Sequence, residues 1–576
     1  MKMLKRSISI LALALSAAVS SSLSAQTLQV LTAGSSAQFG PFAVAAFALA
    51  TNGGVAAFHY TVKSGGCPGT TCYAYLNDSR SITVSGVKHT VPPEPGNLWV
   101  VWSTNGIWAY LSVDSTVGVR SFAAVPRATL TLAALASMPV STTTNFPYWS
   151  DGKKDTAMTA AVYAAINGKA TTAANTDIRP EDALFATNRA LNTLGYGAVA
   201  DPRSGHSGQF LIGNPIESHF SAAIANPVSF AIAGGADPFS GTAGPALVTI
   251  PVGAAPIIFV ASKATGSTVA NASNITTANA SSLFSGVGNC ASTLVTGATG
   301  IIDPVLREPL SGTMNTTEYT VFVPGGHSQE TGVTPPTVGT NKNPLDLACG
   351  TGFRFRGVGT GDVVNNVIAT PNTLGYAFFS YESTGGGKND RYLEYNGVDP
   401  IYPTTHTYSG ALPTCPIVSG VYSCPITPTT GLSFPNLRKG TYTAWSIYRV
   451  ITDSTHLATT QTLVSKAQAL VDNNIPDFVP FTPVCAASAS GLNDPGLDVY
   501  REHFVPSTIA TIPDTVTITP NDGSLGATVT CRTIRATLPA LTLGGGTEAG
   551  GDVGGIIQGP FTANPPHPGP TEGQPH

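Results

Sequence analysis

Several short segments of this chain are apolar without the polar alternation of a half-exposed strand. They are Val228 to Ala233, Leu247 to Val252, Pro256 to Ala261, Leu374 to Phe379 and Ala444 to Ile451. Strands that are apolar on both faces belong in a sheet that is covered on both faces. His456 to Asp472 has the periodicity of an amphipathic helix. We therefore predict an α/β fold with helices packed on a sheet.

The composition narrows the classes of function. Charged residues make up 10% of the chain and the net charge is −4, whereas a nucleic-acid-binding protein needs a basic face. The 61 glycines and 44 prolines predict frequent turns and short helices. We expect no nucleic-acid partner, and the length is sufficient for two or three domains.

Residues 1–25 are typical of a secretory signal. Lys2, Lys5 and Arg6 form a basic start, an apolar core follows from Ile8 to Val19, and small residues lead to a cleavage point near Ala25. The apolar core is too short to span a membrane. We expect a protein without a membrane span, located in the periplasm or secreted.

The eight cysteines all follow the signal, where disulfides persist. Their spacing suggests the pairs Cys67–Cys72, Cys415–Cys424, Cys290–Cys349 and Cys485–Cys531. This connectivity is one of roughly a hundred that eight cysteines allow, so the other pairings stay open.

A candidate anion site lies at Ser311, Gly312 and Thr313, which precede a helical segment from Met314 to Phe322. At a helix start, hydroxyls and unpaired backbone N–H groups converge on one point that suits an anion. Arg307, four residues earlier, adds a planar fork of donors that matches an oxyanion. The alternative is an ordinary helix N-cap without a ligand.

The region from Phe58 to about Pro126 has the pattern of strands, and its aromatic residues favour packing on a sheet face over stacking on a ligand. These residues are Trp99, Trp102, Trp108 and Tyr110. Asp155 to Ile166 and Arg179 to Leu194 are predicted helices. Beyond Ala540 the chain is rich in Gly, Pro and Thr, which predicts a disordered tail.

Five segments, in the same order, resemble the substrate-binding proteins of phosphate ABC transporters, which have the two-lobed type II periplasmic binding fold. The segments are Ala33 to Phe39, Phe230 to Pro238, Ile250 to Val260, Arg307 to Thr313 and Gly375-Tyr376. The segment from Arg307 to Thr313, which is similar to an Arg-Glu-x-x-Ser-Gly-Thr anion clamp, is the most specific of the five.

The resemblance implies a two-lobed fold with a β-rich insertion in the N-terminal half. The implied parts are a signal peptide (1–25), the first part of lobe 1 (26–50 and 226–262), an insertion that is β-rich and then helical (51–225), lobe 2 (263–370), a return to lobe 1 with a C-terminal helix (371–540), and a disordered tail (541–576).

The resemblance also implies a ligand cage for inorganic phosphate or a related oxyanion. Its residues would be Ser35, Ser36, Ala37, Gln38, Phe39, Asp237, Arg307, Ser311, Gly312 and Thr313. Asp237 would accept a hydrogen bond from a protonated phosphate and reject fully ionised sulfate. Because Asp237-Pro238 follows two glycines, a plain turn is the alternative there.

The function implied is solute capture for an ABC transporter permease by a monomer that has no cofactor and is not an enzyme. The main alternative is a secreted interaction or adhesion protein that keeps the binding fold without transporting a small ligand. Gly326-His327-Ser328-Gln329 resembles the nucleophile elbow of a serine hydrolase, but Glu330 stands where that motif needs glycine. The 10 histidines lack metal-ligand spacing, which argues against a metal site.

Overall fold

A computed structural model describes residues 26–178 and 247–480, with gaps of which the longest are 327–342 and 423–433, and four strands beyond residue 480. Its centre is a 13-stranded mixed sheet. In spatial order the strands are β15 (Asn343–Leu345), β16 (Gly352–Gly357), β14 (Asp303–Arg307), β17 (Thr373–Phe378), β11 (Leu247–Ser262), β22 (Trp445–Asp453), β10 (Ala173–Thr176), β1 (Leu28–Gly34), β8 (Gly106–Ser112), β7 (Asn97–Ser103) and β2 (Phe58–Val62), with β18 (Asp390–Tyr392) and β23 (Val479–Pro480) also paired to β11.

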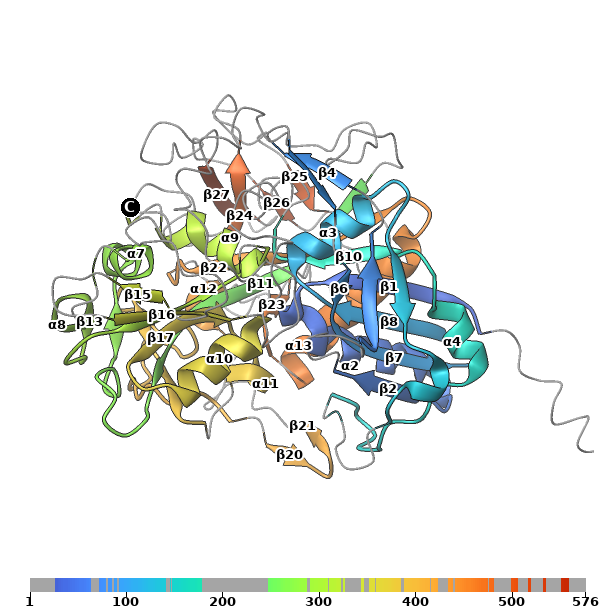
Figure 1. Ribbon diagram of the computed structural model, residues 1–576, viewed down its shortest axis with the longest axis horizontal. Coiled ribbons are helices and arrows are strands. Elements are labelled where there is room, and N and C mark those ends of the chain that lie inside the picture. Colours follow the sequence, from blue (N-terminus) through green and yellow to red (C-terminus); the bar gives the residue numbers. More distant parts are fainter. Residues whose placement is uncertain are drawn as a thin grey trace, which may run out of the picture.

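Two long antiparallel strands, β11 and β22, join two halves of the molecule (Figure 1). The first half is built around β1, β2, β7, β8 and β10, and the second half around β14, β15, β16 and β17. Strand β11 pairs with β22 from Leu247 to Pro256 and then with β17 from Ile257 to Ala261. The two apolar segments predicted between residues 247 and 261 are thus one continuous strand of 16 residues.

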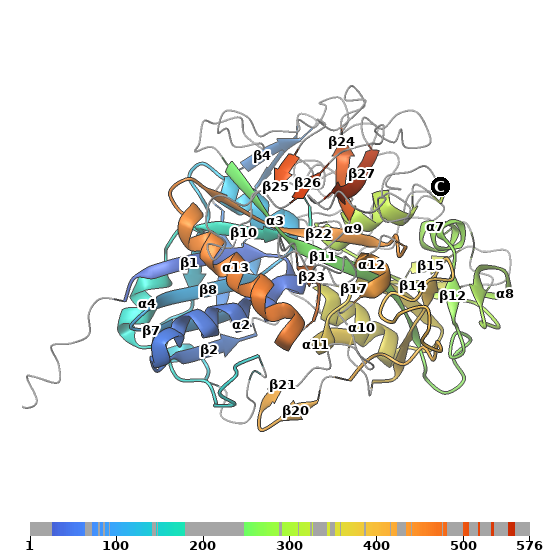
Figure 2. The ribbon, with the colours of Figure 1, turned by 180° about the vertical axis from the view of Figure 1, so that it is seen from behind.

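In the first half, helices cover both faces of the sheet. Helices α2 (Phe39–Ala50) and α13 (Leu457–Asn474) lie side by side on one face, as Figure 2 shows, and α3 (Ser115–Ala123) and α4 (Ala160–Ile166) pack on the other. Side chains along β7 alternate between these two cores: Trp99 belongs to the core under α2, and Leu98 and Val100 to the core under α4. Alternate residues of a strand point to opposite faces, so an apolar strand serves both cores.

The second half repeats this layering. Helix α10 (Gly359–Ala369) packs through Val363 and Val367 against Val305 of β14. The opposite face carries α7 (Thr277–Ser285), whose Phe284 meets Tyr376 of β17 edge to face with 5.1 Å between ring centroids. The predicted α/β fold with a covered sheet is confirmed, and so is the packing role of the aromatic residues at 99, 102, 108 and 110, all of which are buried.

Smaller elements complete the described part of the chain. They are η1 (Ser36–Gln38), η2 (Asn52–Gly54), β3 (Ala74–Asn77), β4 (Ser81–Val84), β5 (Val87–Thr90), β6 (Glu94–Pro95), β9 (Thr129–Leu132), η3 (Leu135–Ser137), β12 (Asn274–Ile275), α8 (Ala291–Leu294), β13 (Val295–Thr296), α9 (Gly312–Thr317), the π-helical turn η4 (Glu318–Phe322), α11 (Tyr381–Thr384), β19 (Glu394–Tyr395), β20 (Ile417–Val418), β21 (Val421–Tyr422), α12 (Pro435–Arg438), β24 (Val499–Val505), β25 (Val516–Ile518), β26 (Arg532–Ile534) and β27 (Gly551–Gln558). Within the ranges that the structure describes, no helix is long and apolar enough to cross a bilayer.

Several predicted elements have different bounds in the structure. The helix predicted from Asp155 begins only at Ala160, because the side chain of Thr159 accepts a hydrogen bond from Val162 N and caps it there, while Asp155 instead bonds to His59 and Thr61. The predicted tail at 541–576 includes β27, which pairs with β24 and β26, and the disorder of this tail stays a prediction. The signal at 1–25 and the helix predicted at 179–194 lie outside the described residues.

The segment at 51–225, expected to be an insertion, supplies β2, β7, β8 and β10 to the central sheet. Strand β10 lies between β1 and β22 and is parallel to β1, with Gly34 opposite Asn175. Its four residues have little β-branched or aromatic character, so the sequence offers only a weak strand signal there. The domain boundaries themselves stay a prediction.

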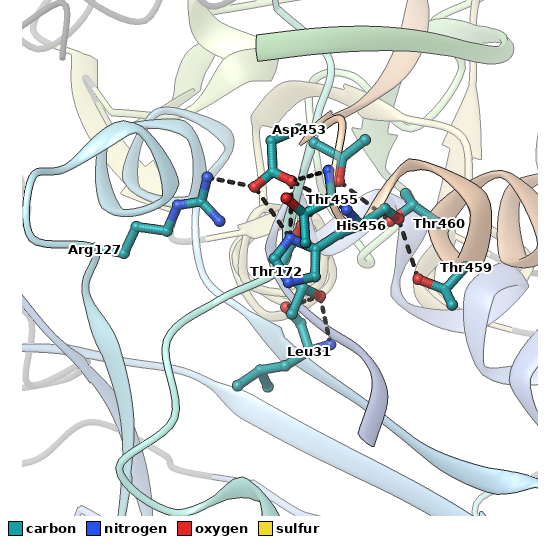
Figure 3. A network of polar contacts seen from close by, with 9 residues as sticks. Leu31, Arg127, Thr172, Asp453, Thr455, His456, Thr459 and Thr460 are labelled. Carbon is teal, nitrogen blue, oxygen red and sulfur yellow. Dashed lines mark hydrogen bonds and ion pairs between the residues drawn. The ribbon is translucent and has the colours of Figure 1, made fainter. Parts of the chain in front are cut away.

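A polar network centred on Asp453 fixes the end of β22 to the first half (Figure 3). Asp453 accepts hydrogen bonds from the backbone N–H groups of Thr455 and His456 and from Arg127 Nη2 at 2.5 Å. Thr452, its neighbour, donates to the carbonyl of Thr172. The network holds the start of α13 against the sheet in the half that contains β1 and β10.

Candidate functional site

Four strand ends, three in the first half and one in the second, place polar residues near the line where the two halves meet. Strands β8 and β10 are parallel to β1, so Ser35 after β1, Ser115 after β8 and Asp177 after β10 follow the same edge of the sheet. Arg307 ends β14 in the second half. In open α/β sheets ligands bind outside the carboxyl ends of the strands, which is where these residues lie.

Arg307 is buried, with 2% of its surface exposed. Its Nε donates to Glu308 Oε2 at 3.1 Å and its Nη2 to Glu308 Oε1 at 2.7 Å. Nη1 donates to Thr313 Oγ1 at 3.0 Å, and Nη2 also lies 3.4 Å from Asp114 Oδ1, which belongs to the first half. The pKa of Arg307 is raised, because burial favours the neutral form but the charges of Glu308 and Asp114 outweigh it. Arg307 is therefore a fixed cation between the halves.

Ser311, Gly312 and Thr313 begin α9, as the sequence indicates. The side chain of Ser311 accepts a hydrogen bond from Met314 N at 3.2 Å, so Ser311 is the N-cap of the helix. This is the arrangement expected of an ordinary cap, and it leaves the hydroxyl hydrogen of Ser311 available to a second partner. All three residues are buried.

The first half presents Asp177 and Ser115 to this helix start. Ser115 Oγ donates a short hydrogen bond to Asp177 Oδ1, and Thr316 of α9 donates to the carbonyl of Asp177 at 3.3 Å. A methyl carbon placed on Gly312 would overlap the Asp177 carboxylate and lie 2.6 Å from Ser115 Oγ. A side chain at position 312 would therefore force the Asp177 carboxyl and the Ser115 hydroxyl to move.

Asp177 is a carboxyl that the sequence reasoning missed. It follows the short strand β10, and the only signal is an acidic residue at the end of that weak strand. Burial raises the pKa of Asp177 to about 7, although the nearby charges of Arg307 and Arg449 lower it. A carboxyl with this pKa exists in both protonation states near neutral pH, so it can accept or donate a hydrogen bond.

The loop from Ser35 to Phe39 is anchored to the same strand end. Ser35 N donates to Asn175 O at 2.8 Å, and Gln38 Nε2 donates to Thr176 O at 2.9 Å. The Gln38 amide oxygen accepts a hydrogen bond from Asn175 Nδ2 at 2.8 Å. Both the amide nitrogen and the amide oxygen of Gln38 are therefore hydrogen-bonded to β10. Ala37 is buried, and the ring of Phe39 packs edge to face on Tyr110 at 5.5 Å between ring centroids.

Ser36 is the residue of this loop that faces the second half. It lies next to Gly359 at the start of α10: a methyl carbon placed on that glycine would be 3.6 Å from Ser36 Oγ. The side chain of Ser36 is only partly buried. The structure therefore brings the loop, Asp177 and the α9 start into one region, and it holds Gln38 in an internal role.

Two fully buried hydroxyls beside these groups have no hydrogen-bond partner among the residues that the structure describes. They are Thr116 Oγ1 in the first turn of α3, next to Ser115, and Tyr448 Oη of β22. Burial raises the pKa of Tyr448 well above its ordinary value, and the charge of Asp177 raises it further, which places its hydroxyl near that carboxyl. Buried polar groups are nearly always paired, so two unpaired hydroxyls here point to a missing partner such as a bound polar ligand.

Asp237, the predicted acceptor, lies outside the described residues, as do His327, Ser328 and Glu330 of the elbow-like segment. Cys72 is the one cysteine within the described ranges, so the pairing of cysteines stays a prediction. In the described part of the chain, no group of three or more His, Cys, Asp or Glu side chains is arranged to hold a metal ion.

No family model matches the sequence, and no curated protein matches it. Solved structures similar to this chain include an ABC-type phosphate transport receptor from Vibrio cholerae (14% identity, 40% of this chain, 72% of that one, TM-score 0.24). A second is a phosphate-binding protein from Stenotrophomonas maltophilia (14% identity, 63% of this chain, 77% of that one, TM-score 0.28). A third is a DING protein (14% identity, 67% of this chain, 90% of that one, TM-score 0.30). All three are named as transport, binding or DING proteins and none as an enzyme. Likenesses this distant do not assign a ligand to this chain.

Proposed function

We propose that this protein binds a tetrahedral oxyanion such as phosphate where its two halves meet around Arg307. The observation that carries the proposal is the convergence of two strand ends: Arg307 and Gly312 at the end of β14 meet Asp177 at the end of β10, and all three residues are buried. The unpaired hydroxyls of Thr116 and Tyr448 add two more groups that a ligand would satisfy.

Each group has a role that follows from its chemistry. Arg307, oriented by Glu308, supplies positive charge, and Thr313 holds its Nη1. Ser311, Gly312, Thr313 and Ser36 supply hydroxyl or backbone N–H donors. Asp177 takes the part foreseen for Asp237: it accepts a hydrogen bond from a protonated phosphate and repels fully ionised sulfate. Catalysis is no part of this proposal.

The wider setting follows from the signal-like residues 1–25 and from the resemblance of the sequence to transporter binding proteins. We propose an exported monomer, located in the periplasm or secreted, that delivers its ligand to an ABC transporter permease. Closure of the two halves about β11 and β22 would trap the ligand, as in hinge closure of two-lobed binding proteins.

Thermal unfolding with added phosphate tests the proposal. A ligand that binds only the folded state at 100 times its Kd stabilises that state by about 2.7 kcal/mol, so the melting temperature should rise with phosphate and not with equal sulfate. No rise with any oxyanion would contradict binding and favour the adhesion alternative.

A matched pair of variants on α9 locates the site. Thr313→Val removes the hydroxyl beside Arg307, and Thr317→Val removes a buried hydroxyl one turn later that donates to the Thr313 carbonyl. We expect Thr313→Val to weaken phosphate binding about tenfold, the size of one lost hydrogen bond to a charged group, and Thr317→Val to retain it. Equal affinities by calorimetry would place the ligand elsewhere.

A further inference from the structure

Helix α10 connects two parallel strands and packs on a third. It follows β16 and precedes β17, and both strands pair in parallel with β14, which lies between them. A connection between parallel strands returns the chain to the opposite end of the sheet, so α10 runs antiparallel to β14. The first turn of α10 therefore lies over the carboxyl end of β14, which is Arg307.

The packing of α10 on β14 places Thr360 near Arg307. Val363 of α10 packs against Val305 of β14, and Arg307, two residues beyond Val305, points to the same face of the strand. Thr360 precedes Val363 by three residues, so it lies on the same side of the helix and nearer to its start. Three helix residues span about 4.5 Å and two strand residues about 6.6 Å, so Thr360 and Arg307 are displaced in the same direction from the contact between the valines.

The hydroxyl of Thr360 is buried and has no hydrogen-bond partner among the residues that the structure describes. The residue is 3% exposed, and buried polar groups are nearly always paired. Because Cα–Cβ bonds in a helix tilt toward its N-terminus, the side chain leans toward the open end of α10 and toward the level of Arg307. An unpaired hydroxyl at this place can be satisfied by an oxygen of a bound ligand.

Two glycines bring the start of α10 close to its neighbours. A methyl carbon on Gly357, which pairs with Arg307 in the register of β14 and β16, would lie 2.7 Å from Val363 Cγ2 and 2.8 Å from Val363 N. Gly359 has a φ of 68°, a left-handed conformation that favours glycine. A methyl carbon there would lie 3.6 Å from Ser36 Oγ, so the loop after β1 in the first half reaches the first residue of α10.

The first half has a matching feature. Helix α3 follows β8, which is parallel to β1, and the hydroxyl of Thr116, the second residue of α3, is the buried and unpaired group already described. Thr360 is likewise the second residue of α10, which follows the parallel strand β16. In each half, therefore, a helix that begins at the carboxyl end of a parallel strand carries a buried threonine hydroxyl without a partner in the described part of the chain.

A ligand beside Arg307 needs donors from other residues, because much of the hydrogen bonding of Arg307 is within the protein. Its Nε and Nη2 donate to Glu308, and its Nη1 donates to Thr313. Asp362 is the acidic residue in the first turn of α10, but residues two apart in a helix do not face each other. Thr360 thus supplies a donor on a side of α10 that Asp362 does not share.

We propose that Thr360 is a further ligand-binding residue of the oxyanion site, and that its hydroxyl forms a hydrogen bond with an oxygen of the bound phosphate. A hydroxyl both donates and accepts, so Thr360 serves an ionised oxygen as well as a protonated one. The inference rests on the proposed function, because it assigns one more contact to the same ligand.

Calorimetric titration with inorganic phosphate tests this contact. Thr360→Val removes the hydroxyl and nearly keeps the shape of the side chain, whereas Thr360→Ser keeps the hydroxyl. We expect Thr360→Val to weaken phosphate binding about tenfold, the size of one lost hydrogen bond to a charged group, and Thr360→Ser to bind phosphate as the wild type does.

Thr171→Val is the matched control. Thr171 is also buried, and its hydroxyl also lacks a partner among the described residues. It precedes β10, whereas Asp177 follows that strand, so Thr171 lies at the opposite edge of the sheet from the site. Thr171→Val should therefore retain the phosphate affinity of the wild type.

Thermal unfolding without phosphate separates a lost ligand contact from a damaged fold. Removing a buried hydroxyl that has no partner relieves its desolvation penalty, so the melting temperatures of Thr360→Val and Thr171→Val should equal or exceed that of the wild type. A lower melting temperature in Thr360→Val alone would show that its hydroxyl bonds within the protein, and would overturn the inference. Equal phosphate affinities of Thr360→Val and the wild type would overturn it as well and leave the proposed function intact, whereas absence of phosphate binding in the wild type would overturn the proposed function and this inference together.

Discussion

Replacing Gly312 by alanine is the sharpest test of how the halves meet. Position 312 begins α9, and in a helix alanine is favoured over glycine by about 1 kcal/mol. Propensity alone therefore predicts a more stable protein. The structure predicts the reverse, because the added methyl would overlap the Asp177 carboxylate and lie 2.6 Å from Ser115 Oγ, whereas ordinary contact begins at 3.4 Å.

The neighbours of Gly312 have little freedom to yield. Asp177 and Ser115 are buried and joined by a short hydrogen bond, and both lie in the first half while Gly312 lies in the second. Either α9 withdraws by more than an ångström or the Asp177 carboxyl moves and loses its partner. Overpacking of this kind costs about 1–3 kcal/mol, which exceeds the gain in propensity.

Gly361 supplies the matched control. It lies inside α10, and a methyl placed there would meet only Ser383 Oγ at 3.8 Å, which is ordinary contact. Gly361→Ala should therefore gain about 1 kcal/mol, and the two alanine variants should differ by about 2–4 kcal/mol.

Denaturant unfolding followed by tryptophan fluorescence measures this difference by linear extrapolation. Gly312→Ala should also lose its response to phosphate, while Gly361→Ala keeps it. If Gly312→Ala is as stable as Gly361→Ala and still responds to phosphate, the halves do not meet at this glycine and the reasoning fails.

Two predictions concern pH. The pKa of Asp177 is raised from 3.8 to about 7. The carboxyl therefore stabilises the folded state most at pH below about 4, and this stabilisation is lost as pH rises to about 7. The three-unit shift corresponds to about 4 kcal/mol of unfolding free energy as an upper figure. Asp177→Asn should flatten this part of the stability profile relative to the wild type in denaturant titrations from pH 4 to pH 8, and parallel profiles would argue against a buried, titrating Asp177. Asp453 has the opposite sign: burial would raise its pKa, but hydrogen bonds from Arg127 and His456 lower it on balance, so its contribution is present above about pH 4 and is lost as pH falls below its ordinary range. Asp453→Asn should therefore be less stable than the wild type at pH 7, and the difference should shrink as pH falls below about 4; a difference that does not change with pH would contradict the ion-pair account of Figure 3.

The location of Arg307 and of the α9 start was open to prediction from sequence. Helix capping is local, because the side chain of Ser311 accepts a hydrogen bond from the backbone N–H of Met314, three residues later. The residue types Ser, Gly and Thr therefore identify the helix start without tertiary information. The apolar strands β17 and β22 and the amphipathic helix α13 were also predictable from sequence. Their patterns of apolar residues follow from which faces of each element are buried.

The partners of Arg307 were not predictable in the same way. Asp114 is 193 residues from Arg307 and occupies a position where the sequence suggests only a helix cap. Asp177 follows a four-residue strand with little strand propensity, which forms because β1 and β22 pair with it on both sides. The free energy of pairing with neighbouring strands outweighs the local conformational preference of these residues. Because the neighbouring strands are distant in sequence, a short segment of the sequence does not reveal this pairing.

By itself, then, the sequence determined the α/β class, the cap at Ser311 and an arginine before it, because periodicity and capping act over a few residues. Only the tertiary structure decided that Asp114 and Asp177 lie near that arginine, because the ends of β8 and β10 in the first half meet the end of β14 in the second. The electrostatic character of the site depends on those long-range contacts, since burial raises the pKa of Asp114 and of Asp177, whereas Arg307 lowers the pKa of Glu308 despite its burial.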